Sequence, residues 1–112
     1  MTDIRQLHRA LISRVLGDNA TAPAALRRFA FEADLAEAGC GEPLRTLIEK
    51  VAYHSEQVTD ADFAAVRATG LSEDQIFEVV VCAAIGQADR QYANALAALA
   101  DATGEAGSPD EA

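Results

Sequence analysis

Cys40 is the residue whose surroundings most favour chemistry. It stands between Gly39 and Gly41, shortly before a helix that should begin near Pro43. Backbone N–H groups and the positive end of a helix dipole can lower the pKa of a thiol in such a setting, which favours a redox or nucleophilic role. No companion cysteine or base lies beside it in the sequence, so a thiol in an ordinary loop is the alternative interpretation.

A polar cluster on the expected third helix is the other candidate site. Glu49, Tyr53 and Glu56 fall on one helical face, with Lys50 and His54 beside them. A Glu and a His in one neighbourhood could serve as acid and base. A solvent-facing set of charge pairs explains the same residues without a site.

The remaining reactive residue types give no further motif. Cys82 sits in the most apolar part of the chain and is expected to be a core residue, and His8 receives no role. No window offers enough ligands at one place for a metal ion, and the two cysteines form neither a disulfide framework nor a zinc signature. Glycine-rich phosphate loops and nucleophile elbows are absent from the sequence, so we expect no cofactor.

Charge excludes some classes of partner. The chain has 112 residues and a net charge of −9, which argues against nucleic acid or an anionic membrane as the main partner. Residues 1–50 carry seven basic and seven acidic groups, whereas residues 51–112 carry two and eleven. The second half is therefore either a solvated acidic surface or an acidic face on which the basic amino-terminal helix docks, of the same subunit or of another. No leader resembling a signal peptide opens the sequence, so a cytoplasmic location is expected.

The elements that must position these residues are all helical. Residues 71–100 are predicted to form one long core helix, because Ser72 and Gln75 make a capping box and Leu71 and Ile76 a hydrophobic staple. Glu78 is the one strongly polar residue between 76 and 85, so we expect this half of the helix to be surrounded by other elements or other subunits. The second half should have one solvent-facing side, which carries Asp89, Arg90, Gln91 and Asn94. Its apolar stripe continues through Phe77, Val81, Ile85, Ala88, Tyr92, Leu96 and Leu99.

Four shorter helices are expected before the long one. The first begins at Thr2 or Asp3 and ends near Gly17, and the third fades near Gln57. The second starts at the signal of Thr21 and Pro23, and the fourth runs from a Thr59 cap to Gly70. In the second helix, Leu26, Phe29, Ala30 and Ala33 should face inward and Arg27, Arg28, Glu32 and Asp34 outward. The sequence thus predicts one all-α domain over residues 1–101, followed by a disordered acidic tail over residues 102–112.

The order of three segments resembles a known family. The helix LRTLIEKVAY is followed by the capped segment TDADFAAVRATG and then by LSEDQIFEVVVCAAIG. This order is similar to that of the carboxymuconolactone decarboxylase and alkylhydroperoxidase D-like (AhpD-like) family, over about residues 44–100 and most specifically over residues 66–76. The resemblance implies an AhpD-like helical bundle that assembles as a homo-oligomer, a trimer or a hexamer.

The sequence departs from this family where the chemistry should be. The peroxidase branch carries Cys-x-x-Cys followed by His, and those positions fall at about Ser55, Val58 and Asp62. Residues 44–70 contain no cysteine, and only Glu49 and His54 lie near the place of a decarboxylase acid and base.

Three functions stay open on this basis. The first is a family-like oligomer without the dithiol, which either acts on a small organic acid or lactone in a pocket at a subunit junction or has lost catalysis. The second is a non-enzymatic subunit that binds another protein. The third is a redox protein that uses Cys40 alone.

Overall fold

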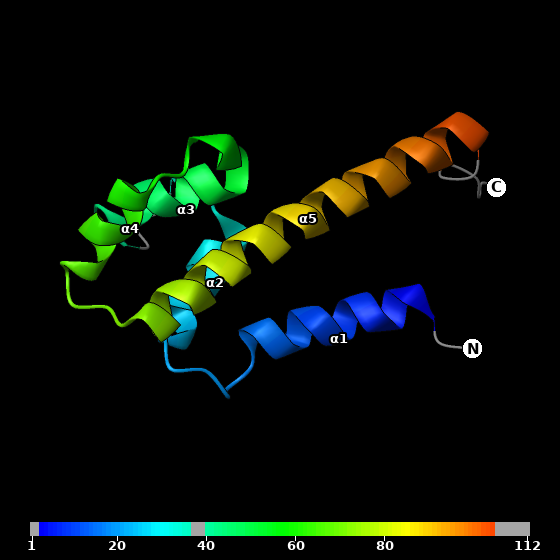
Figure 1. The fold of residues 1–112 in the computed structure, drawn as a ribbon. Coiled ribbons are helices and arrows are strands. Elements are labelled where there is room, and N and C mark those ends of the chain that lie inside the picture. Colours follow the sequence, from blue (N-terminus) through cyan, green and yellow to red (C-terminus); the bar gives the residue numbers. More distant parts are fainter. Residues whose placement is uncertain (1–2, 37–39, 105–112) are drawn as a thin grey trace.

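The described part of the chain is entirely helical. The structure is a computed structural model that describes residues 3–36 and 40–104, and within these residues it contains no strand. Figure 1 shows the order and arrangement of the elements, which are α1 (Ile4–Leu16), α2 (Ala24–Glu32), α3 (Leu44–Tyr53), the 3₁₀ turn η1 (Ser55–Gln57), α4 (Asp60–Arg67) and α5 (Glu73–Thr103). The predicted all-α class and the long carboxy-terminal helix are confirmed.

Side-chain caps start three of the helices, α1, α4 and α5, where the sequence places them. Asp3 accepts a hydrogen bond from the Arg5 N–H at 3.0 Å and caps α1. Both predicted capping boxes form, from Thr59 to Asp62 at α4 and from Ser72 to Gln75 at α5. These interactions span one helical turn, so adjacent residues are enough to fix the starts.

Two helix ends differ from the prediction. The third helix ends at Tyr53 and gives way to η1, rather than fading as one helix near Gln57. The long helix continues to Thr103, beyond the expected boundary of the domain at residue 101, and Gly104 closes it in the left-handed conformation with φ of 77°. The remainder of the predicted tail, residues 105–112, lies outside the described residues.

The core forms where α2 and α3 pack on the first half of α5. Its fully buried large side chains are Leu47, Ile48, Val66, Val79 and Cys82. The closest approach is at Gly86, where an added Cβ atom would overlap the carbonyl group of Phe31. Absence of a side chain at Gly86 is therefore what allows α2 to reach the α5 backbone.

Arg27 lies inside the fold, and the prediction that it faces outward is wrong. Only 3% of Arg27 is exposed. Its guanidinium donates hydrogen bonds to the carbonyl oxygens of Val15, Gly17 and Ala22 at 3.1, 2.5 and 3.0 Å. Carbonyl groups at the end of a helix have no partner within that helix, so Arg27 satisfies them and joins the end of α1 to the start of α2.

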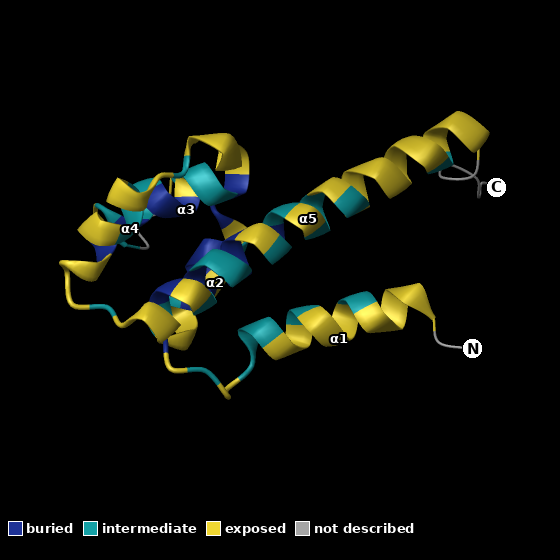
Figure 2. Cartoon of the chain, viewed as in Figure 1, coloured by how far each residue is buried: buried dark blue, intermediate teal, exposed yellow. Residues whose placement is uncertain are grey.

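The molecule is elongated because α5 outruns the core. It measures 56 × 28 × 24 Å, and a helix of 31 residues is by itself about 46 Å long. Figure 2 shows that the half of α5 nearest its carboxyl end is largely exposed, and all its buried residues lie between 76 and 86. The prediction of a buried core helix is therefore confirmed for the first half of α5, whereas the second half, for which the sequence predicts one solvent-facing side, is largely exposed in the single chain.

The first helix lies beside this projecting half of α5 and buries none of its residues. His8 Nε2 approaches Asp89 Oδ1 at 2.7 Å, and the His8 ring lies 5.2 Å from that of Tyr92. None of the described helices is long and apolar enough to cross a membrane.

Candidate functional site: an apolar pocket between α4 and α5

The structure does not bring the sequence candidates together. Cys40 precedes α3, Glu49 is exposed on α3, and His54 is exposed at the carboxyl end of that helix. Within residues 3–36 and 40–104, no hydrogen bond or ion pair links Glu49 to His54. This arrangement gives no support to an acid and base acting as a unit.

The surroundings of the two thiols disfavour the thiolate form. Partial burial raises the pKa of Cys40, a shift that Arg45 opposes and Glu42 reinforces. This direction is opposite to the one that a reactive thiol requires. Cys82 is 1% exposed, as predicted for a core residue, and burial raises the pKa of its thiol as well.

The positions at which the peroxidase motif would fall do not share one helix. Ser55 lies in η1, Val58 follows that turn, and Asp62 lies in the first turn of α4. Asp62 accepts hydrogen bonds from the Thr59 N–H at 2.8 Å and from Lys50 Nζ at 3.0 Å. The bond from the Thr59 backbone, followed by that from Lys50, lowers the pKa of Asp62, whose carboxylate thus fastens α4 to α3.

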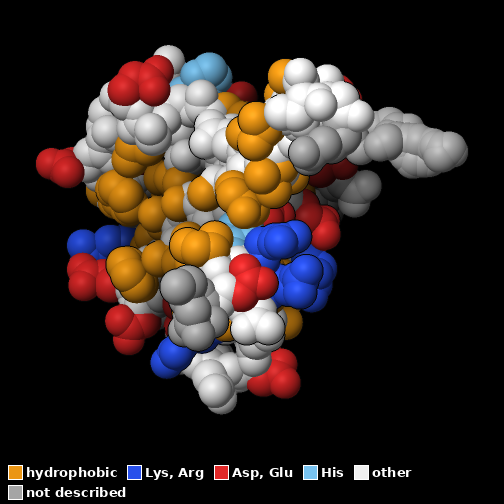
Figure 3. Space-filling view, turned by 90° about the vertical axis from the view of Figure 1, so that its right-hand side faces the viewer, with side chains coloured by type: hydrophobic (Ala, Val, Ile, Leu, Met, Phe, Trp, Pro, Cys, Tyr) orange, Lys and Arg blue, Asp and Glu red, His pale blue; other side chains and the backbone are white. Residues whose placement is uncertain are grey.

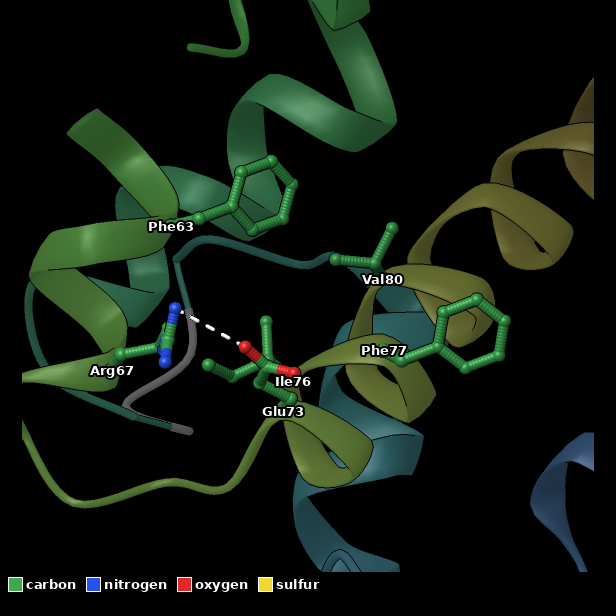
Figure 4. A pocket seen from close by; sticks show the side chains of 6 residues that line it. All are labelled: Phe63, Arg67, Glu73, Ile76, Phe77 and Val80. Carbon is green, nitrogen blue, oxygen red and sulfur yellow. Dashed lines mark ion pairs between the residues drawn. The ribbon is translucent and has the colours of Figure 1, made fainter. Parts of the chain in front are cut away.

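An apolar pocket of about 300 Å³ opens instead between α4 and α5. Figure 4 shows the six residues that line it, which are Phe63 and Arg67 from α4 and Glu73, Ile76, Phe77 and Val80 from α5. Ile76 is buried, Phe63 and Val80 are half-buried, and the Phe77 ring points away from Arg67. The walls are therefore almost wholly hydrocarbon.

One ion pair sits at the rim of this pocket. Arg67 Nη1 lies 3.2 Å from Glu73 Oε2, and both side chains are largely exposed. A guanidinium has five N–H donors, so a single contact with Glu73 leaves donors for another acceptor. An apolar cavity with a guanidinium at its mouth suits a ligand that has a hydrocarbon body and one carboxylate.

Sequence reasoning missed this pocket, although part of its signal was present. Arg67 and Glu73 both fall within residues 66–76, the most specific part of the family resemblance. Phe63 and Ile76, in contrast, are ordinary apolar positions of two different helices. Nothing in their spacing shows that the turn at Gly70 folds α4 back over α5.

A second hollow, of about 320 Å³, lies between α1 and α5 on the other side of Phe77. Two of its polar groups, Glu78 and Arg27, already have structural partners, and the side chains of Arg14 and Asn19 also line it. Glu78 accepts hydrogen bonds from the N–H groups of Thr21 at 3.0 Å and Ala22 at 2.6 Å, and Arg27 is occupied as described above. Glu78 and Arg27 hold the loop before α2, so neither group is available to a ligand in this hollow.

Comparisons with known proteins add no assignment to this geometry. No protein-family model, curated protein or solved structure matches the chain. Over the described ranges, no group of three or more His, Cys, Asp or Glu side chains is placed to hold a metal ion.

Proposed function

We propose that this protein is a helical, oligomeric binding protein that takes a small, largely apolar organic acid into the pocket between α4 and α5. The observation that carries the proposal is the pairing of hydrocarbon walls with Arg67 at the rim. The resemblance to the AhpD-like family supports it, because that family forms helical oligomers. The proposal is for binding, since Glu49 and His54 do not line the pocket.

Binding would follow from two simple exchanges. The ligand body displaces water from Phe63, Ile76 and Val80, which contributes roughly 25 cal/mol for each Å² of apolar surface removed from water. The ligand carboxylate replaces Glu73 as the partner of Arg67. Glu73 thus acts as an internal competitor, whose departure costs only the small energy of an exposed ion pair.

Calorimetric titration with phenylacetate and with hexanoate tests this proposal. We expect saturable binding that Arg67→Met weakens about tenfold or more, since a charge-assisted hydrogen bond is lost. Glu73→Gln should strengthen binding by about two- to fivefold, because the competitor for Arg67 is removed. Arg5→Met is the matched control, since Arg5 is an exposed arginine on α1.

Two results would contradict the proposal. One is that neither acid binds, and the other is that Arg67→Met and Arg5→Met bind the acids equally well.

A non-enzymatic protein-interaction subunit is the second candidate. It is favoured by the exposed large hydrophobic residues, which are Ile4, Leu7, Leu11, Tyr53, Phe77, Leu96 and Leu99. Six of the seven lie on α1 and α5. Soluble proteins that expose contiguous apolar surface commonly use it to bind a partner. The third candidate, redox chemistry through Cys40, loses support because burial raises the pKa of that thiol.

A further inference from the structure

The outer face of α5 is an apolar surface that no part of the described chain covers. We define it by Phe77, Val81, Ala84, Ala88, Ala95 and Leu99, which share one side of the helix with a single polar residue, the exposed Gln91. Phe77 is 69% and Leu99 60% exposed, the three alanines are exposed, and Val81 is half-buried. The opposite side carries Val79, Ala83 and Gly86, which are buried against α2 and α3.

The outer face lies between two lines of contact. On one flank, Cys82 and Asp89 meet α1, and on the other, Ile76 and Val80 meet α4 across the pocket. Figure 3 looks at the molecule from the end where α1 and α5 project and shows hydrophobic side chains gathered there, with Lys and Arg groups to one side. The outer face is thus flanked by other elements and open to an incoming helix.

The spacing along this face is that of helix pairing. Steps of four and three residues from Phe77 through Val81 and Ala84 to Ala88 keep one seam directed at a neighbouring helix. Small residues in the middle allow two helix axes to come close, whereas Phe77 and Leu99 are bulky residues at the two ends. Between them the seam is about 33 Å long.

The face is also self-complementary. Phe77 lies eleven positions before Ala88, and Leu99 lies eleven positions after it. In a two-fold pair each contact occurs twice, so an antiparallel pair centred on Ala88 brings both bulky ends against each other and places the two copies of Ala88 in contact at the middle. Residues 105–112 contain no large hydrophobic side chain.

We infer that the occupant of the outer face is a second copy of this chain, antiparallel, with Phe77 of each copy against Leu99 of the other. This inference rests on the oligomeric part of the proposed function. The pair forms either a dimer or the repeating unit of a hexamer. Because Phe77 also lines the pocket, the pair places the partner chain at the pocket edge and makes the pocket a feature of a subunit junction.

Cysteine cross-linking tests the register of the pair in the full chain with Cys40→Ser and Cys82→Ala. Under mild oxidation we expect Ala88→Cys to give a covalent dimer, because the two-fold axis brings this position next to itself. Ala95→Cys is the matched control, since it faces Val81 of the other copy and should remain uncrosslinked. Equal cross-linking at both positions, or none at Ala88→Cys while the protein is still oligomeric, would overturn the register.

A charge exchange, read by light scattering at micromolar concentration, tests the contact itself. Phe77→Lys and Leu99→Glu should each weaken association at least about tenfold, because a lone charge is placed in an apolar contact. The double variant should recover most of the loss, since each Lys then meets a Glu of the other copy. Circular dichroism checks that each variant keeps its helices.

The outcomes separate two failures. If the unaltered chain is a monomer, the oligomeric part of the proposed function fails together with the inference. The inference alone fails if the chain is an oligomer and neither single variant weakens its association, or if the double variant does not restore association. It also fails alone if the chain is a trimer in which the copies are not paired.

Discussion

Gly86 shows how one residue sets the distance between two helices. Its missing side chain is what lets the carbonyl group of Phe31 approach the α5 backbone. Two residues strengthen the same junction: Arg90 donates to the Phe31 oxygen at 2.7 Å, and the Tyr53 hydroxyl donates to the Ala33 oxygen at 3.1 Å. The carboxyl end of α2 is thus fastened by α3 and α5 together.

Replacing Gly86 with Ala should destabilise the fold by about 1–3 kcal/mol, because the added methyl group forces α2 away from α5. The better helix propensity of Ala offsets up to about 1 kcal/mol of this cost. Chemical denaturation measures the change. Gly41→Ala is the matched control, since a Cβ atom there meets nothing within 4 Å. Equal stability of both variants would show that α2 does not pack as closely as described.

Glu78 holds a loop against a helix. It is the single strongly polar residue between Ile76 and Ile85 of α5, and it joins that helix to the loop before α2 through the N–H groups of Thr21 and Ala22. Burial acts to raise its pKa, but the hydrogen bonds from Thr21 and Ala22 outweigh this effect and hold the pKa below its ordinary value of 4.5. The presence of this polar residue in an apolar stretch of helix is explained by its hydrogen bonds to the loop.

The lowered pKa predicts a pH dependence of stability. A carboxyl group whose pKa is lower in the folded state stabilises the fold above its unfolded pKa, and that contribution disappears as the pH falls through the folded value. Denaturation from about pH 7 to about pH 3 should therefore show stability falling on the acidic side of 4.5. Glu78→Gln should be less stable at neutral pH and should have a shallower acidic decline.

Thr21→Val gives a graded comparison for this experiment. It removes one hydroxyl donor but leaves both backbone N–H groups on Glu78, so its loss of stability at neutral pH should be smaller. If the stability of Glu78→Gln falls as steeply with decreasing pH as that of the unaltered chain, the pH dependence of stability comes from other carboxylates.

At the scale of the whole molecule, burial is concentrated at one end. The core joins α2, α3 and the first half of α5, whereas α1 and the second half of α5 project from it with most of their apolar residues exposed. The exposed apolar side chains at the projecting end stabilise the protein only if another chain packs against them. This is the physical basis for proposing an oligomer.

Hydrogen exchange can map this uneven burial. Amides of α3 and of residues 76–86 should exchange slowest, and those of α1 and residues 92–103 fastest, because the latter have few buried contacts. Raising the protein concentration should slow exchange in residues 92–103, and Phe77→Lys should abolish that slowing. Uniform protection along α5 at all concentrations would contradict this account.

The sequence by itself determined the features that depend on neighbours within about one helical turn. These are the helical class, the caps at Thr59 and Ser72, and the core position of Cys82. The tertiary structure decided what depends on residues far apart in the chain. Arg27 turned inward because unpaired carbonyl groups of α1 lay within its reach, and Arg67 joined an apolar pocket because α4 folds back on α5. Periodicity shows which side of α5 is apolar, but it does not show which apolar side another element of the same chain will cover.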